Sequence, residues 1–150
     1  MAEVQIRAYR EQYGLNYVTV IPTNIYGPND NFDLDNGHVV PSLIHKCYLA
    51  KKNNTPFKIW GSGKPLREFI FSKDVAKLTE WVLDNYESNE PLILSTSEEV
   101  SIKDVVNLIV KHMSFTGEIF GNRTNLMGSL ENLVIIVNYY LTYQNLNLLV

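Results

Sequence analysis

The sequence has little cysteine and little excess charge, and each shortage excludes a class of protein. Its single cysteine, Cys47, excludes an internal disulfide framework and favours a reducing compartment. A net charge of −3 gives no sign of a surface for nucleic-acid phosphates, so we predict no nucleic-acid partner. Charges at Glu3, Arg7 and Arg10 interrupt the first residues, which leaves no apolar core of a signal peptide. We therefore expect a cytoplasmic protein, and we predict no metal site.

The last thirty residues are almost without charge. From Phe120 onward only Arg123 and Glu131 are charged, and the final run "NLVIIVNYYLTYQNLNLLV" has the length of a membrane span. Four asparagines, one glutamine and one threonine interrupt this run, and no basic residue flanks its end. We therefore predict no membrane partner. We divide the chain into a domain over residues 1–119 and a divergent apolar tail over 120–150, either packed or foreign to the rest.

Segments with helical and strand patterns alternate along the first part of the chain. The patterns predict helices at residues 3–13, 39–52, 72–86 and 101–113. They predict strands at residues 17–21, 57–60, 67–71 and 92–96. Ser72 is expected to cap one helix, and Ser101 with Asp104 matches the capping-box pattern of another. The alternation indicates an α/β protein with a parallel sheet.

The segment "IPTNIYGPNDNFDLDNGHVVP", residues 21–41, follows the most strand-like stretch. In α/β sheets, ligands bind beyond the carboxyl ends of strands, so this loop is a candidate site. Asn24 offers a carboxamide that can both donate and accept hydrogen bonds. His38 can exchange protons near neutral pH. Taken residue by residue, a turn-rich connection with an incidental histidine remains an open alternative.

Three longer motifs carry a resemblance to a known family. The stretches "PTNIYGPNDNF", "GHVVPSLIHK" and "IWGSGKPLREFIFSKDVA" resemble the C-terminal half of the extended short-chain dehydrogenase/reductases, and within them the GDP-L-fucose synthases. The resemblance runs over residues 3–119. It implies a partial NAD(P)-binding Rossmann-type fold with a substrate-binding subdomain, a homodimer, and NADP as cofactor. It also implies conversion of GDP-4-keto-6-deoxy-D-mannose to GDP-L-fucose, by 3,5-epimerisation followed by 4-reduction.

The resemblance assigns roles to individual residues. The segment beside the nicotinamide of NADP corresponds to Pro22, Thr23, Asn24 and Ile25. His38 matches a general acid/base of the epimerisation that also lies near the cofactor. The positions that hold the GDP-sugar correspond to Val39, Lys46, Trp60 and Arg67.

The chemistry of the three larger substrate residues agrees with these roles. Lys46 can address a diphosphate as a point charge, Arg67 can bind phosphate oxygens in a bidentate manner, and Trp60 offers a flat apolar face. Each has a plainer alternative. Lys46 can be a solvated helix lysine, Trp60 a core residue, and Arg67 the partner of Glu68 in a surface ion pair.

Parts of the family pattern have no match at the family's positions. The Gly-rich turn that receives the dinucleotide pyrophosphate is not found, nor are the Ser and the Tyr-x-x-x-Lys pair that protonate the carbonyl oxygen. We therefore expect a piece of an enzyme that is inactive alone. Three alternatives stay open: another nucleotide-sugar epimerase or dehydratase, a non-catalytic fragment that pairs with full-length enzyme through residues 3–13, and a gene-model artefact.

Overall fold

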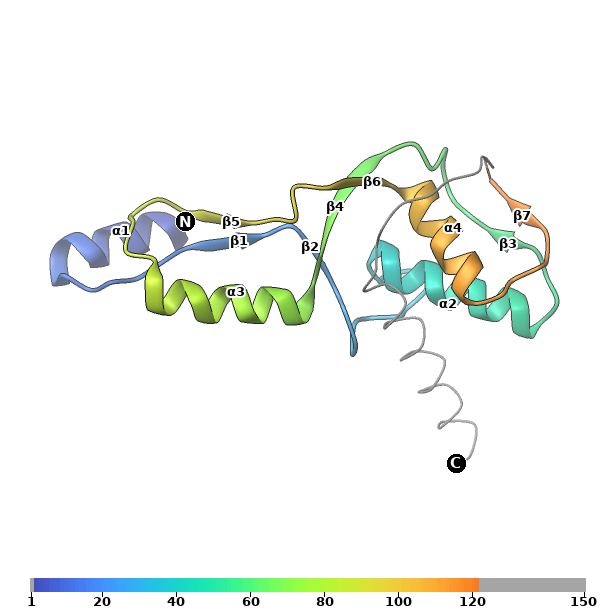
Figure 1. The fold of residues 1–150 in the computed structure, drawn as a ribbon, viewed down its shortest axis with the longest axis horizontal. Coiled ribbons are helices and arrows are strands. Elements are labelled where there is room, and N and C mark those ends of the chain that lie inside the picture. The colour runs from blue at the N-terminus through green and yellow to red at the C-terminus, as the bar shows by residue number, and fades with distance from the viewer. Residues whose placement is uncertain (1, 122–150) are drawn as a thin grey trace, which may run out of the picture. The chain divides into compact units, whose positions relative to one another are not determined.

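The chain folds into alternating helices and strands, seen in a computed structural model that describes residues 2–121 (Figure 1). The helices are α1 Ala2–Tyr13, α2 Val39–Lys52, α3 Ser72–Asn85 and α4 Ile102–His112. The strands are β1 Val20–Pro22, β2 Asn24–Tyr26, β3 Phe57–Lys58, β4 Leu66–Phe71, β5 Leu92–Leu94, β6 Glu99–Ser101 and β7 Ile119–Phe120. The strands β1 and β5 pair in parallel, as do β3 and β7. The predicted α/β class is confirmed.

The described residues divide into two compact units. Unit 1 contains residues 2–25 and 68–98, and unit 2 contains residues 26–67 and 99–121. The chain passes between the units within β2 and β4, which belong to a three-stranded sheet of order β2-β4-β6.

Unit 1 is built on the two-stranded sheet of β1 and β5. An apolar cleft of about 450 Å³ lies between this sheet, α1 and α3, with Ile6, Val20 and Val82 in its lining. Ile21 and its register partner Ile93 point to the other face of the sheet, where they are 47% and 65% exposed. One face of the sheet is therefore covered within unit 1, and the other is open.

The predicted strand at residues 17–21 is shorter in the structure and begins later, at Val20. The register pairs Val20 with Leu92, which places Thr19 opposite Pro91. Because proline has no N–H group, pairing cannot continue in that direction beyond the hydrogen bond from Leu92 N to Thr19 O of 2.9 Å. The prediction of a loop directly after this strand is also wrong, since β2 begins at Asn24.

The helix α3 begins differently from the prediction. Its N-cap residue is Phe71, with no side-chain cap, and Ser72 is the first helical residue. Val82 is its one buried residue, while Leu78 is exposed. The β4 strand runs directly into this helix, so the backbone of Phe71 takes the capping position before Ser72 can.

Unit 2 holds a densely packed core between α2, α4 and β3. Its buried apolar side chains are Tyr26, Val40, Leu43, Ile44, Cys47, Ala50, Phe57, Val105, Val106, Ile109, Met113 and Phe115. The predicted capping box is confirmed, because Ser101 Oγ accepts from Asp104 N at 3.1 Å and the Asp104 side chain reaches back to Ser101. The predicted helix over residues 39–52 is confirmed at both ends.

The predicted tail falls almost entirely on residues 122–150, which lie outside the part of the chain that the structure describes. Within residues 2–121, no helix combines the length and apolar character needed to cross a membrane.

Candidate functional site

An open cleft in unit 2 brings together two of the predicted substrate residues. The Nζ of Lys46, on α2, lies 4.3 Å from the centroid of the Trp60 ring. The cleft has a volume of about 470 Å³, and its lining is Lys46, Leu49, Ala50, Thr55, Pro56, Lys58 and Trp60. Trp60 is 78% exposed, which rules out the alternative that it is a core residue. A cation beside an exposed aromatic face can bind a flat, negatively charged molecule.

The alternation of side chains along β3 explains why this cleft carries positive charge. Alternate residues of a strand point to opposite sides, and Phe57 is buried with no exposed surface, whereas Lys58 is exposed. Lys58 and Trp60 therefore share the outer side, and both line the cleft together with Lys46. Sequence reasoning missed Lys58, although the alternation of apolar and polar residues in "FKIW" contains the signal.

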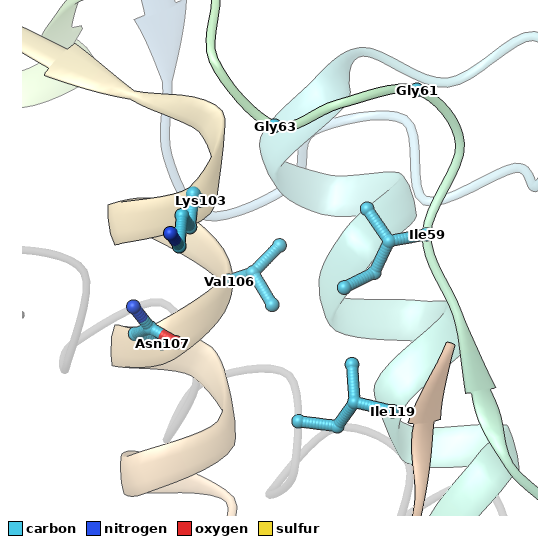
Figure 2. Close-up of a pocket in the computed structure, with 7 residues that line it drawn as sticks. All are labelled: Ile59, Gly61, Gly63, Lys103, Val106, Asn107 and Ile119. Carbon is cyan, nitrogen blue, oxygen red and sulfur yellow. The ribbon is translucent and has the colours of Figure 1, made fainter. Parts of the chain in front are cut away.

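The loop after Trp60 is fixed to the beginning of α4. Gly63 O accepts from Lys103 N at 3.0 Å, and Pro65 O accepts from Ile102 N at 3.1 Å. Gly63 has a φ of +69°, and a Cβ there would lie 3.1 Å from the Cβ of Lys103, so a glycine suits both the backbone and the close approach. This contact leaves only a small crevice of about 20 Å³, where the Ile59, Val106 and Ile119 side chains point toward one another (Figure 2). The crevice positions the loop and offers no room for a ligand.

Arg67 and Val39 are the other two predicted substrate residues. Arg67 Nη1 donates to the carbonyl of Leu66 at 2.7 Å, and Val39 is the exposed first residue of α2. Glu68 accepts a hydrogen bond from the Ser95 hydroxyl, and no ion pair between Arg67 and Glu68 occurs among the described residues. The guanidinium of Arg67 therefore keeps most of its donors for other partners.

The predicted cofactor segment lies at the carboxyl end of β1, in unit 1. Thr23 N donates to Leu94 O at 3.0 Å, and Thr23 Oγ1 is buried without a partner among the described residues. The side-chain amide nitrogen of Asn24 donates to Glu68 O at 2.7 Å, which connects β2 to β4. The side-chain oxygen of Asn24 stays available to accept a hydrogen bond. The orphaned threonine hydroxyl and this oxygen fit the amide end of a nicotinamide. Pro22 and Ile25 flank the two polar groups, and Ile25 is exposed.

His38 lies in unit 2 as the N-cap residue of α2, with φ −65° and ψ 163°. Its side chain makes no capping hydrogen bond and is 78% exposed. Its Nδ1 lies 3.6 Å from Oδ1 of Asp30, a residue that sequence reasoning missed. An exposed imidazole beside a carboxylate is suited to proton transfer.

Three further residues with reactive groups do not form part of the candidate site. Cys47 is fully buried, and burial raises the pKa of its thiol to about 12, so it stays protonated and inert. Tyr48 and Lys52 have the Tyr-x-x-x-Lys spacing, but they lie at the end of α2, where the Lys52 Nζ contacts the Tyr48 ring at 5.9 Å. Among residues 2–121, the cleft, the predicted cofactor segment and His38 remain as the candidate functional elements.

Comparisons with known proteins show which family the chain resembles. GDP-L-fucose synthase of Dictyostelium discoideum is 56% identical over 121 residues, which cover 79% of this chain and 38% of the relative. GDP-L-fucose synthase of Sinorhizobium fredii is 40% identical over 114 residues, covering 75% of this chain and 36% of the relative. The chain thus spans about two fifths of the length of these curated relatives. The predicted resemblance to GDP-L-fucose synthases is confirmed.

Solved structures show the same similarity in three dimensions. The crystal structure of a GDP-L-fucose synthetase from Naegleria fowleri bound to NADP superposes with a TM-score of 0.84 at 34% identity. The match covers 95% of this chain and 52% of that structure. The model of the NAD dependent epimerase/dehydratase family matches residues 1–95. The chain therefore belongs to the NAD dependent epimerase/dehydratase family.

Proposed function

We propose that this chain binds a GDP-sugar in the Lys46–Trp60 cleft and contributes to the conversion of GDP-4-keto-6-deoxy-D-mannose to GDP-L-fucose. The observation that carries the proposal is the lysine over an exposed tryptophan ring at 4.3 Å, in an open cleft of about 470 Å³. The names of the similar proteins supply the substrate class.

The cleft has a separate group for each part of a nucleotide diphosphate. The indole of Trp60 offers a stacking face for the base or the sugar. Lys46 and Lys58, which both line the cleft, would provide two positive charges for the diphosphate. Arg67, on β4, does not line the cleft, but its guanidinium carries a fork of donors suited to phosphate oxygens.

The cofactor segment supports an NADP-dependent reduction. Thr23 Oγ1 and Asn24 Oδ1 would hold the carboxamide of the nicotinamide, and Pro22 and Ile25 would exclude water beside it. When bound, NADPH supplies the hydride for the reduction. These residues fit only the nicotinamide end, because the sequence contains no G-x-x-G-x-x-G turn for the pyrophosphate.

His38 would supply the proton chemistry. Its exposed imidazole can remove a proton from the carbon next to the substrate ketone and later return one. Epimerisation requires proton transfer on both faces of the carbon, and the described residues offer no second exposed acid or base in the family's pattern. We therefore expect the isolated chain to bind the sugar nucleotide and to turn it over weakly or not at all.

Tryptophan fluorescence tests the binding directly. The chain has two tryptophans, Trp60 in the cleft and Trp81 on α3 in unit 1. GDP should quench the fluorescence of the wild-type chain and of Trp81→Phe to a similar extent. Trp60→Phe should lose the response, and Lys46→Ala should weaken it. A GDP response that survives in Trp60→Phe would place the nucleotide elsewhere.

The same titration separates the enzyme alternatives. Stronger binding of UDP than of GDP would favour another nucleotide-sugar epimerase or dehydratase of the family. A measurement of NADPH oxidation with the keto-sugar nucleotide tests the second half of the proposal. Turnover at rates typical of whole enzymes would contradict the expected inactivity of the isolated chain.

A second candidate function is pairing with full-length enzyme. The helix α1 has no buried residue, and Val4, Tyr9 and Tyr13 on it are exposed apolar side chains. Tyr9 and Tyr13 are four residues apart and share one side of the helix, where exposed aromatic rings suit a helix-to-helix dimer contact. Light scattering after size exclusion checks this proposal. A dimer that Tyr13→Asp converts to monomer supports it, and a monomeric wild type that does not associate with full-length enzyme contradicts it.

A further inference from the structure

His38 and Asp30 form a pair that the sequence does not reveal. They are eight positions apart, in a segment without regular structure. In the structure, Nδ1 of His38 lies 3.6 Å from Oδ1 of Asp30. His38 is 78% exposed, whereas Asp30 is only 14% exposed. A partly buried carboxylate thus faces one nitrogen of an imidazole that is mostly open to solvent.

Asp30 is held in place by its own backbone surroundings. Its Oδ1 accepts a hydrogen bond from Asn31 N at 2.7 Å. The Oδ1 of Asn31 in turn accepts from Asp33 N at 3.0 Å. On the other side of the loop, the carbonyl of Phe32 lies 2.7 Å from Nδ1 of His45 on α2. The carboxylate is therefore fixed before any substrate arrives.

The end of the loop brings His38 back toward the carboxylate of Asp30. Asp33 Oδ1 accepts hydrogen bonds from Asn36 N at 2.7 Å and Asp35 N at 3.0 Å, and Gly37 N donates to Asp33 O at 3.1 Å. A Cβ at Gly37 would lie 2.3 Å from Asp33 O, so only glycine allows this closure. The loop thus turns back by the residue before His38.

From this geometry we propose that Asp30 is a positioning residue for His38. Its carboxylate keeps the proton of the neutral imidazole on Nδ1 and leaves Nε2 as the atom that exchanges protons with substrate. The inference rests on the proposed role of His38 as an acid/base. In that step the substrate C–H bond breaks, its electron pair enters the enolate, and the proton goes to Nε2. The Nδ1 proton stays in place beside Asp30, which stabilises the imidazolium.

Other charged groups near the loop are occupied or point elsewhere. The carboxylate of Asp33 accepts hydrogen bonds from the backbone N–H groups of Asn36 and Asp35. Asp35 is exposed and makes no ion pair within residues 2–121. On α2, Lys46 faces the Trp60 ring. Asp35 therefore provides a matched control, because its removal takes the same charge from the same loop.

Nitrogen-15 NMR of the histidine side chains tests the proposal without any ligand. The chain has three histidines, so a His38→Gln variant assigns the signal. Free histidine favours the Nε2–H tautomer, whereas the proposal predicts mainly Nδ1–H at His38 in the wild type. Asp30→Asn should reduce the ratio of Nδ1–H to Nε2–H by about two- to fivefold, the range for a partly exposed charge contact. Asp30→Glu should restore part of it, and Asp35→Asn should leave it unchanged.

Two results would overturn the inference. One is a wild-type His38 that is mainly Nε2–H, a result that needs no variant to fold. The other is an equal change in Asp30→Asn and Asp35→Asn, which would indicate a general effect of loop charge. Failure of GDP to bind would instead contradict the proposed function, since the tautomer is measured on the free chain.

Discussion

The two units differ in how far each buries its own apolar surface. Unit 2 encloses Ile44, Cys47, Phe57, Val105 and Ile109 with no exposed surface. Unit 1 leaves α1 without a buried residue and leaves one face of its sheet open at Ile21 and Ile93. Since burial of apolar surface is the main stabilising contribution in folding, unit 2 should be the more stable part of the chain.

The difference also separates the functional elements. The proposed substrate cleft and the His38–Asp30 pair lie in unit 2, where a packed core supports the elements that carry them. The predicted cofactor segment lies in unit 1, at the end of a two-stranded sheet. We therefore expect the chain to retain the recognition of a sugar nucleotide better than the binding of a dinucleotide.

The largest expected loss of stability comes from a cavity in the core of unit 2. Ile109→Ala should lower the free energy of unfolding of unit 2 by about 3 kcal/mol, because it removes a fully buried side chain. Leu83→Ala, at a position of unit 1 that is mostly exposed, should change it by less than about 0.5 kcal/mol. Urea unfolding of single-tryptophan variants, with Trp60 reporting on unit 2 and Trp81 on unit 1, measures both. Equal losses for the two variants would remove the contrast between the units.

A second pair of variants compares one glycine from each unit. Gly37→Ala should destabilise the chain by about 2 kcal/mol, because its Cβ would meet the backbone of Asp33 at 2.3 Å. Gly14→Ala should cost about 1 kcal/mol, since Gly14 has a φ of +66° but no atom near the new Cβ. Thermal unfolding ranks the two changes. A greater loss at Gly14 would mean that the loop before His38 can relax.

The beginnings of α4 and α3 sharpen the comparison further. Ser101→Ala should reduce the stability of unit 2 by about 1 kcal/mol, because it breaks the capping box of α4. Ser72→Ala should have little effect, since Phe71 is the N-cap residue of α3. Urea unfolding measures the losses. A loss at Ser72 as large as that at Ser101 would restore its predicted role as a cap.

The smallest expected effect concerns the stability of the chain at acidic pH. The N–H groups of Asn36 and then Asp35 lower the pKa of Asp33 below its ordinary value of 3.8. A group with a lowered pKa in the folded state contributes stability above its unfolded pKa, and this contribution disappears as pH falls through the folded pKa. Asp33→Asn should therefore flatten the pH dependence of stability in that acidic range. Asp84→Asn, on α3 of unit 1, removes the same charge from another element and serves as the charge-matched control.

The sequence predicts the elements where local signals and packing agree. The helix α2 and the capping box of α4 are both predicted, since apolar periodicity and end signals coincide there. The beginning of β1 is not predictable from its apolar residues, because Pro91 on the neighbouring strand limits the pairing. The predicted cap of α3 at Ser72 is wrong for a similar reason. The strand β4 leads directly into the helix, so Phe71 becomes the N-cap residue.

The candidate site likewise contains residues that the sequence predicts and residues that it does not. The family resemblance singles out Lys46 and Trp60, and the structure brings them into contact. The resemblance does not point to Lys58 or Asp30, because their roles depend on which way a strand and a loop direct them. Asp30 is one of three aspartates in its loop, and only the fold distinguishes it from Asp33 and Asp35.

A titration of the nitrogen-15-labelled chain with GDP, followed by backbone amide shifts, tests the central claim most directly. The account predicts shifts at Lys46, Lys58 and Trp60 in unit 2, with signals of α1 and β5 in unit 1 unchanged. Shifts confined to unit 1, or none in the cleft at saturating GDP, would contradict the account.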